Sequence, residues 1–118
     1  MHTFKEIIIK HPRVGRLPTL DLQGKWLESL GFITGKTVHM SYQDSTLTLS
    51  TTPIGINPTS VLQVTTRFVR NRPRTCLVLD WWLLKRYGIK VGDCVGLCLS
   101  QGMIQMTKIN RFTVATCA

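Results

Sequence analysis

The stretch LDLQGKWLESLGFITGKTV, residues 20–38, decides the fold because it returns in altered form as LVLDWWLLKRYGIKVGDCV at residues 77–95. The two stretches align without a gap at an offset of 57 residues, which pairs Gly31 with Gly88 and leucine with leucine at several positions. Self-similarity at a fixed offset is the signature of an internal repeat. The sequence therefore predicts that one small structural unit is present twice.

Each half reads as the same series of short elements. A strand rich in β-branched residues opens the unit, a basic connector follows, and a strand with alternating leucines comes next. A helix of about two turns then carries an apolar stripe and ends at a glycine, which tolerates left-handed backbone angles. A glycine turn and a β-hairpin complete the unit. The expected opening strands are residues 4–11 and 61–69, the alternating strands 19–22 and 76–79, the helices 24–32 and 81–89, and the hairpins 33–50 and 89–108.

The length favours a single domain, residues 1–118, built from both units. The first unit is expected at residues 4–51 and the second at 62–108, with the proline- and glycine-containing segment 52–61 as the linker. One unit alone could hardly bury its own apolar face. We therefore expect the halves to interleave around one β-rich core.

The charge balance points to a polyanionic partner. Fifteen Lys and Arg residues against six Asp and Glu residues give a formal net charge of +9, and such a positive field attracts DNA or RNA. No apolar run approaches the roughly 20 residues of a membrane-spanning helix, and the N-terminal stretch lacks the apolar region of a secretory signal. We expect no membrane partner and a cytoplasmic protein, associated with the nucleoid if it binds DNA.

The cysteines predict neither a metal site nor a cofactor. None of the four forms a C-x2-C pair or stands at metal-ligand spacing from a histidine. Cys94 and Cys98 fall on one face of the same expected strand, but the rise per residue separates them by roughly 13 Å, too far to share a metal ion. The prediction is that the protein binds no metal and no cofactor.

The basic residues gather in front of the two alternating strands. Eight of the fifteen cations lie in these lead-in segments, and the 57-residue offset pairs Lys10 with Arg67 and Arg13 with Arg70. Two such segments related by an approximate two-fold axis should converge on one side and follow phosphate backbone. A charged face that merely solubilises the domain is the alternative. The predicted nucleic-acid contacts are Lys10, Arg13, Arg16, Arg67, Arg70, Arg72 and Arg74, with auxiliary contacts from Lys5, Lys25, Lys85 and Arg86.

The first unit resembles the SymE-like toxin family. The resemblance rests on Gly24-Lys25-Trp26-Leu27-Glu28, then Gly31-Phe32 and Gly35, is strongest over residues 4–51, and continues as a diverged second copy at 62–108. SymE-like proteins belong with the AbrB, MazE and SpoVT swapped-hairpin superfamily. The resemblance implies a mainly β fold with short helices, a tandem swapped-hairpin (AbrB-like) β-barrel that forms a single-chain pseudo-dimer.

The resemblance also implies a function. SymE-like proteins are toxins of toxin–antitoxin systems, so it implies a growth inhibitor that binds DNA or RNA through phosphate contacts, under antisense RNA control of its transcript. It equally implies an endoribonuclease that cleaves mRNA. A third reading is a transcriptional regulator or antitoxin of the AbrB and MazE kind. Assembly of the pseudo-dimer into a homo-oligomer is left open.

The residues themselves display no convincing catalytic constellation. RNA cleavage without a metal needs a general base, a general acid and a cation for the developing charge. The candidate acids and bases do not recur in the second unit, so the catalytic residues and the question of enzyme activity stay unassigned. These candidates are His11, His39, Glu6, Glu28 and Asp21.

Overall fold

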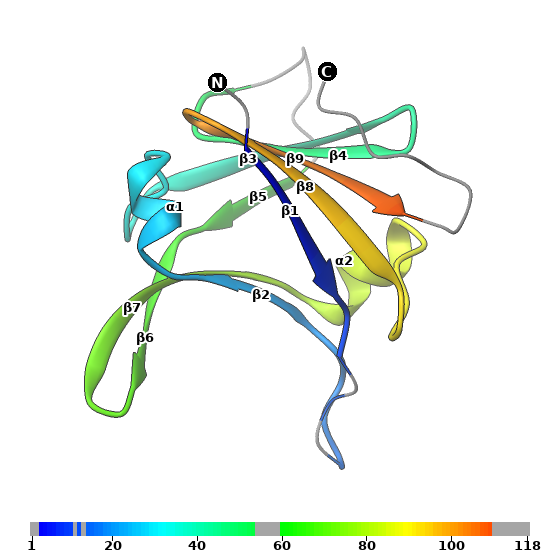
Figure 1. The fold of residues 1–118 in the computed structure, drawn as a ribbon, viewed down its shortest axis with the longest axis horizontal. Helices are drawn as coiled ribbons and strands as arrows, with labels where there is room; N and C mark the ends of the chain where they lie inside the picture. The colour runs from blue at the N-terminus through cyan, green and yellow to red at the C-terminus, as the bar shows by residue number, and fades with distance from the viewer. Residues whose placement is uncertain (1–2, 11, 13, 54–59, 110–118) are drawn as a thin grey trace.

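The computed structural model of the chain describes residues 3–10, 12, 14–53 and 60–109, which form nine strands and two short helices (Figure 1). The mainly β class with short helices is confirmed. The elements are β1 (Thr3–Ile8), β2 (Leu20–Gln23), α1 (Lys25–Ser29), β3 (Thr37–Gln43), β4 (Thr46–Ser50), β5 (Ser60–Gln63), β6 (Thr65–Val69), β7 (Arg72–Leu79), α2 (Trp81–Arg86), β8 (Cys94–Ser100) and β9 (Met103–Ile109).

The strands form two sheets with the core between them. The larger sheet has the order β1-β8-β9-β4-β3-β5, and the smaller has the order β2-β7-β6. Figure 1 shows the larger sheet above the smaller one, with α1 and α2 on opposite sides. Both sheets are open, so the closed barrel implied by the resemblance is corrected. Within the described residues, the edge strands β1 and β5 each pair with a single neighbour.

The halves of the chain are interlocked by strand exchange. The opening strand β1 pairs with β8 of the second half, and β5 of the second half pairs with β3 of the first. The pairs β2–β7 and β4–β9 also cross between the halves. Neither half could complete its sheets from its own strands. Strands from the two halves of the chain are thus paired with each other in both sheets.

Two of these pairings keep the 57-residue offset in their register. In β2–β7, Leu20 lies opposite Leu79 and Leu22 opposite Leu77. Adding 57 to one partner and subtracting it from the other converts the first pair into the second. The β4–β9 register behaves in the same way. The strand pairing at the centre of each sheet is therefore symmetric under exchange of the halves.

The opening strands follow a different offset. The Gly35 backbone N–H donates to the Val64 carbonyl at 2.8 Å, and the Gly92 N–H donates to the Ile9 carbonyl at 2.8 Å. The two glycines are 57 residues apart, but Val64 and Ile9 are 55 apart. The connector before β2 is thus two residues shorter than its counterpart before the leucines of β7. The expected equivalence of Lys10 with Arg67 is wrong, because the gap falls between the opening strand and the alternating strand.

A single apolar cluster joins the two layers. The buried leucines of β2 and β7 form the lower layer of this cluster, and side chains of β3, β4, β8 and β9 form the upper layer. Both helices end where the sequence predicts, since Gly31 and Gly88 have φ of 95° and 71°. The side chains that fill the centre are Leu20, Leu22, Leu27, Val38, Met40, Leu47, Leu49, Leu77, Leu79, Leu83, Leu84, Val95, Leu97, Ile104 and Met106.

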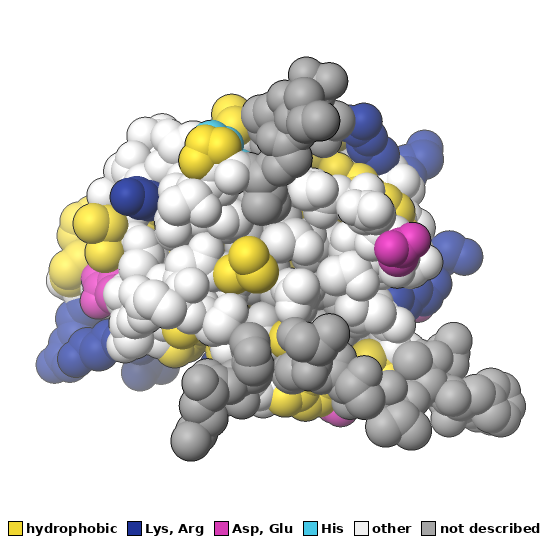
Figure 2. Space-filling view, turned by 90° about the horizontal axis from the view of Figure 1, so that it is seen from above, with side chains coloured by type: hydrophobic (Ala, Val, Ile, Leu, Met, Phe, Trp, Pro, Cys, Tyr) yellow, Lys and Arg dark blue, Asp and Glu magenta, His cyan; other side chains and the backbone are white. Residues whose placement is uncertain are grey.

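The side of the molecule above the larger sheet carries little charge at its centre. Figure 2 shows mostly uncharged surface there, with Lys and Arg side chains toward the rim. No helix among the described residues is long and apolar enough to cross a membrane.

The symmetric β2–β7 pair predicts large effects of truncating its leucines. Leu22 and Leu77 are completely buried, so Leu22→Ala or Leu77→Ala should each lower the free energy of unfolding by about 2–5 kcal/mol. Urea denaturation followed by far-UV circular dichroism measures this. Leu17→Ala removes the same atoms from a side chain that is 65% exposed and should change stability little. Equal losses in all three variants would contradict the proposed core.

Candidate nucleic-acid interface

The basic connector of the second half is a β-hairpin, which the sequence analysis missed. Strands β6 and β7 are joined by a two-residue turn at Arg70 and Asn71, whose φ values are 52° and 63°. Positive φ at both central residues marks the turn type that suits the twist of a hairpin, and asparagine tolerates it well. Pro73 lies within β7, although proline is unfavourable in a strand because it cannot donate a ladder hydrogen bond. Residues 65–75 nonetheless form an arm below the core (Figure 1).

The arm has two different faces. Cross-strand partners share a face, and alternate pairs lie on the same side. Arg67 lies opposite Arg74 and Val69 opposite Arg72, so the arginines share one face. The other face carries Phe68, which is 70% exposed, opposite Pro73.

The arginine face continues onto the outer surface of the smaller sheet. Along β7, Cys76 and Val78 follow Arg74 on the same side, and they lie opposite Gln23 and Asp21 of β2. The leucines of both strands point to the other side, into the core. The sheet therefore presents one polar surface that runs from β2 to the tip of the hairpin. We call this surface the arginine face, defined by Asp21, Gln23, Arg67, Arg72 and Arg74.

One ion pair crosses the arginine face. Arg67 Nη1 donates to Asp21 Oδ2 at 2.6 Å, and the Thr19 hydroxyl donates to Asp21 Oδ1 at 2.9 Å. The hydrogen bond and the charge of Asp21 raise the pKa of Arg67 above its ordinary value. Arg67 is therefore held in place by a carboxylate and is not a free cation. Because the pair is partly exposed, it contributes less than about 1 kcal/mol to stability.

The ion pair also explains a buried cysteine on an outer surface. On β7, Cys76 lies between Arg74, which is opposite Arg67, and Val78, which is opposite Asp21. Its side chain is only 1% exposed. Burial raises the pKa of the Cys76 thiol, Arg67 lowers it and Asp21 raises it. The thiol is consequently shielded and mostly protonated, as expected of a structural cysteine.

Three arginines of the arm lack any such partner. Arg70, Arg72 and Arg74 are exposed, and within the described residues none of them forms an ion pair or a side-chain hydrogen bond. Each guanidinium offers a planar fork of donors that matches a phosphate group. Their mutual repulsion is relieved only by counter-ions or a bound anion. The arm is thus arranged to receive negative charge.

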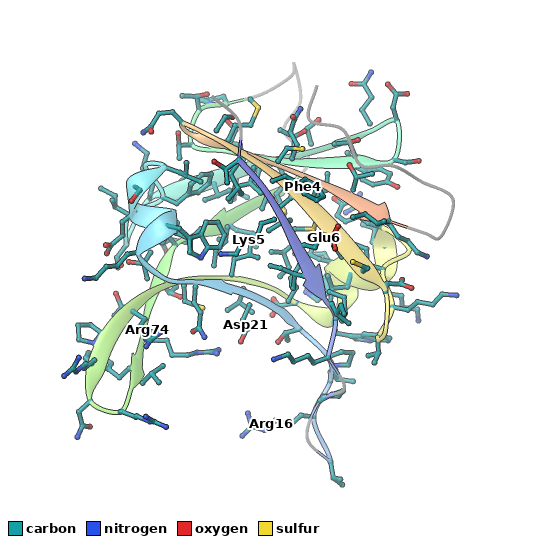
Figure 3. The ribbon with its side chains drawn as sticks, in the orientation of Figure 1. Phe4, Lys5, Glu6, Arg16, Asp21 and Arg74 are labelled. Atoms are coloured by element: carbon teal, nitrogen blue, oxygen red, sulfur yellow. The ribbon has the colours of Figure 1, made fainter. Side chains whose placement is uncertain are left out.

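The first basic segment lies on the same side of the molecule. Lys10 and Arg16 are exposed and line a cleft of about 420 Å³ together with Asp21. Figure 3 shows Arg74, Asp21 and Arg16 all on the lower side, below the larger sheet. Asp21 therefore borders both basic segments, since it pairs with Arg67 and also lines this cleft. Arg13 and His11 lie outside the described residues.

The auxiliary cations are distributed differently. Lys5 of β1 stacks over the Trp26 ring at 4.5 Å, which ties β1 to α1. Lys85 and Arg86 lie on α2, at the other end of the molecule from the hairpin (Figure 1), and Arg86 approaches the Tyr87 ring at 5.9 Å. The structure thus separates Lys85 and Arg86 from the β6–β7 arm. Lys25, in contrast, lies beside the arm.

A second cleft separates α1 from the arm. It has a volume of about 450 Å³ and is lined by Lys25, Glu28, Arg72, Arg74 and Thr75, among others. The Thr75 hydroxyl donates to Glu28 Oε1 at 2.6 Å. The two residues are 47 positions apart, so no local pattern in the sequence could have paired them. Elsewhere in the described residues, His39 Nδ1 is buried without a hydrogen-bond partner, and no group of His, Cys, Asp or Glu is suited to hold a metal ion.

Comparison with known proteins finds a family whose model is similar to part of the first half of the chain. Residues 7–51 match the family model described as "Toxin SymE, type I toxin-antitoxin system". The chain is 30% identical over 54 residues to "Endoribonuclease SymE" of Shigella flexneri and to "Toxic protein SymE" of Escherichia coli (strain K12). Each match covers 46% of this chain and 48% of the relative, so the chain spans about half the length of the relatives it matches. No solved structure matches significantly.

The Asp21–Arg67 pair predicts the reactivity of Cys76. Asp21→Asn removes a charge that raises the thiol pKa and releases Arg67, which lowers it. The thiol pKa should therefore fall, and alkylation of Cys76 near neutral pH should accelerate by about two- to tenfold as the thiolate fraction rises. Iodoacetamide labelling followed by peptide mass spectrometry measures this rate.

Asp44→Asn is the matched control, because it removes the same charge at the exposed β3–β4 turn. It should leave the rate unchanged. An unaltered rate in Asp21→Asn would show that the ion pair does not shield the thiol.

Proposed function

From the SymE-like character of residues 7–51, we propose that this chain is a SymE-like toxin that binds nucleic acid and thereby inhibits growth. The observation that supports the proposal is that Arg70, Arg72 and Arg74 of the arm are exposed and form no ion pair among the described residues, with Lys10 and Arg16 on the same side of the molecule. Such a concentration of cations on one side of the molecule complements the negative charge of a phosphate backbone.

The proposed contacts are to phosphates and not to base edges. Contacts of arginine and lysine with phosphate position a protein on nucleic acid but carry no sequence information. Five described cations are available for this role: Lys10, Arg16, Arg70, Arg72 and Arg74. Neutralising five phosphates of B-DNA would give a salt slope of about −4.5 in log–log form. Binding should therefore be strong at low salt and weakly selective, to DNA and to RNA alike.

Growth inhibition would follow from the protein occupying DNA or mRNA. A polycationic protein that covers DNA competes with transcription, and one that covers mRNA competes with translation. Both actions require a cytoplasmic location, and coating of DNA would place the protein at the nucleoid. Antisense RNA control of the transcript is part of the same proposal by resemblance to the SymE family.

We also propose that residues 4–51 and 62–108 are two copies of one ancestral unit, joined by the linker 52–61. Support comes from the registers of β2–β7 and β4–β9, which are symmetric under a 57-residue exchange. The chain would then be a pseudo-dimer, in which the approximate two-fold axis brings both basic segments to one side. The unit that normally requires a second chain would here find its partner within the same chain.

An endoribonuclease is the second candidate function. A relative with this name matches the first half of the chain. The structural observation in its favour is the cleft between α1 and the arm, which combines a carboxylate with cations. Binding and cleavage are compatible, because Arg72 and Arg74 belong to the arm and also line this cleft.

The phosphate-binding proposal predicts a change in salt dependence. Arg72→Gln with Arg74→Gln should reduce the slope of log affinity against log salt by about 1 to 2 for a DNA duplex. Fluorescence anisotropy across a salt titration measures it, with RNA tested in parallel. Induction of the same variant should inhibit growth less than the wild type.

The matched control removes two cations elsewhere. Lys90→Gln with Lys108→Gln makes the same charge change away from the arm, at the α2–β8 turn and on β9. It should alter the slope much less. Equal effects of both double variants would mean that only the net charge matters and would defeat the arginine face as the binding surface.

The pseudo-dimer predicts the behaviour of a fragment. Residues 1–53 lack the partners of β1, β2 and β4, which are β8, β7 and β9. The fragment should therefore be unfolded as a monomer and gain β structure only as it dimerises at higher concentration. Circular dichroism and analytical ultracentrifugation over a concentration series test this. A fragment that folds as a monomer would contradict the proposal.

A further inference from the structure

The cleft between α1 and the β6–β7 arm holds a carboxylate without an ion-pair partner. Of the six acidic residues in the chain, Asp21 and Asp93 form ion pairs. Glu28 lines a cleft together with Lys25, Arg72 and Arg74, but within the described residues no salt bridge neutralises it. A carboxylate that lines a cleft with three cations, and that no described residue neutralises, can interact with a bound ligand.

A hydrogen bond fixes the orientation of this carboxylate. The Thr75 hydroxyl donates to Glu28 Oε1 at 2.6 Å, and Thr75 is only 5% exposed. The donor therefore sits on a rigid, buried part of β7. Glu28 Oε2 accepts no hydrogen bond from another described residue. One oxygen is thus anchored, and the other is left without a hydrogen bond to any described residue.

The cleft is continuous with the proposed binding surface. Arg72 and Arg74 belong to the arm and also line the cleft. A phosphodiester backbone held by these arginines where they line the cleft would come within reach of Glu28. The second half has no equivalent arrangement, because Lys85 stands at the position 57 residues after Glu28. The combination of base and cations therefore occurs at one of the two related positions.

We propose that this cleft is a catalytic site that cleaves RNA by transesterification, with Glu28 as the general base. Glu28 Oε2 removes the proton from a ribose 2′-hydroxyl, whose oxygen attacks the adjacent phosphorus. The bond from phosphorus to the 5′-oxygen breaks, and the leaving oxygen takes a proton from the Lys25 ammonium. The products are a 2′,3′-cyclic phosphate and a 5′-hydroxyl, and exchange with water restores Glu28 and Lys25. The inference rests on the proposed binding of nucleic acid.

The surrounding cations supply the remaining catalytic requirement. Negative charge develops on the phosphoryl oxygens in the transition state, and positioned cations stabilise it. Arg72 and Arg74 are suited to this because their forks can hold two phosphoryl oxygens at once. No metal ion and no added water are needed for the step. DNA is excluded as a substrate, since it lacks the 2′-hydroxyl.

The test compares Glu28→Gln with the wild type on a fluorescent single-stranded RNA oligonucleotide. Glutamine keeps the shape and can still accept the Thr75 hydrogen bond, but it cannot remove a proton. We expect the initial cleavage rate to fall by about 10²- to 10⁴-fold, with RNA affinity unchanged. Product analysis should find the cyclic phosphate, and DNA of the same sequence should remain intact.

Asp44→Asn provides the control, because it neutralises an exposed carboxylate at the β3–β4 turn, which does not line the cleft. It should cleave as the wild type does. Circular dichroism and RNA affinity report whether Glu28→Gln is folded. If it is not, Lys25→Gln decides, since it leaves the Glu28–Thr75 bond in place: a rate loss of tenfold or more supports the site, and an unchanged rate overturns it.

The outcomes separate this inference from the proposed function. Full activity of folded Glu28→Gln, or no cleavage of RNA by the wild type, overturns the catalytic site. If the wild type still binds RNA with a steep salt dependence, the binding proposal survives that failure. Loss of both binding and cleavage in the wild type would overturn both.

Discussion

The antiparallel pairing of β2 with β7 is the constraint on which the rest of the structure depends. It joins the two halves, and its leucines fill the lower layer of the core. Because one side of these strands must face the core, the alternation of side chains forces Asp21, Gln23, Cys76 and Arg74 to the outside. A register shift of one residue would bury charged groups and expose the leucines. The composition of the arginine face is therefore a consequence of how the core is packed.

The same pairing places charge where it can act. The β6–β7 arm extends from β7, and the segment with Lys10 and Arg16 leads into β2, so both approach the sheet from the same side. Asp21 moderates this concentration of cations by pairing with Arg67 and covering Cys76. The ion pair fixes the part of the arm nearest the sheet, while the outer arginines stay exposed for binding of phosphate. The part of the arm near the sheet can be rigid while the part near the turn carries exposed charge, because the ion pair and the arginines without an ion pair among the described residues lie at successive positions along the arm.

Sequence reasoning reached the parts of the fold that depend on local chemistry. A few neighbouring residues encode each of these features: the termination of the helices near Gly31 and Gly88, the alternating leucines, and the glycine turns. The closed barrel and the equivalence of Lys10 with Arg67 were wrong, because sheet closure and a two-residue gap depend on how distant strands meet. The hairpin was missed because the segment between the expected strands 61–69 and 76–79 was interpreted as a basic connector, whereas residues 72–75 extend β7. For the candidate site, the sequence found the arginines but not the Asp21–Arg67 and Glu28–Thr75 contacts, which join residues 46 and 47 positions apart.

The difference between the two related halves bears on how one chain could combine binding and cleavage. In a homodimer, every substitution appears on both sides of the axis, so a carboxylate introduced beside a basic arm would weaken phosphate binding twice. Within a single chain the two halves can differ, and here Glu28 of α1 aligns with Lys85 of α2 at the 57-residue offset. A carboxylate repels phosphate unless neighbouring cations outweigh it. Glu28 stands where Lys25, Arg72 and Arg74 do so. A single chain with two non-identical halves can thus place a carboxylate on a basic surface at one position only, where the neighbouring cations preserve the attraction for a polyanion.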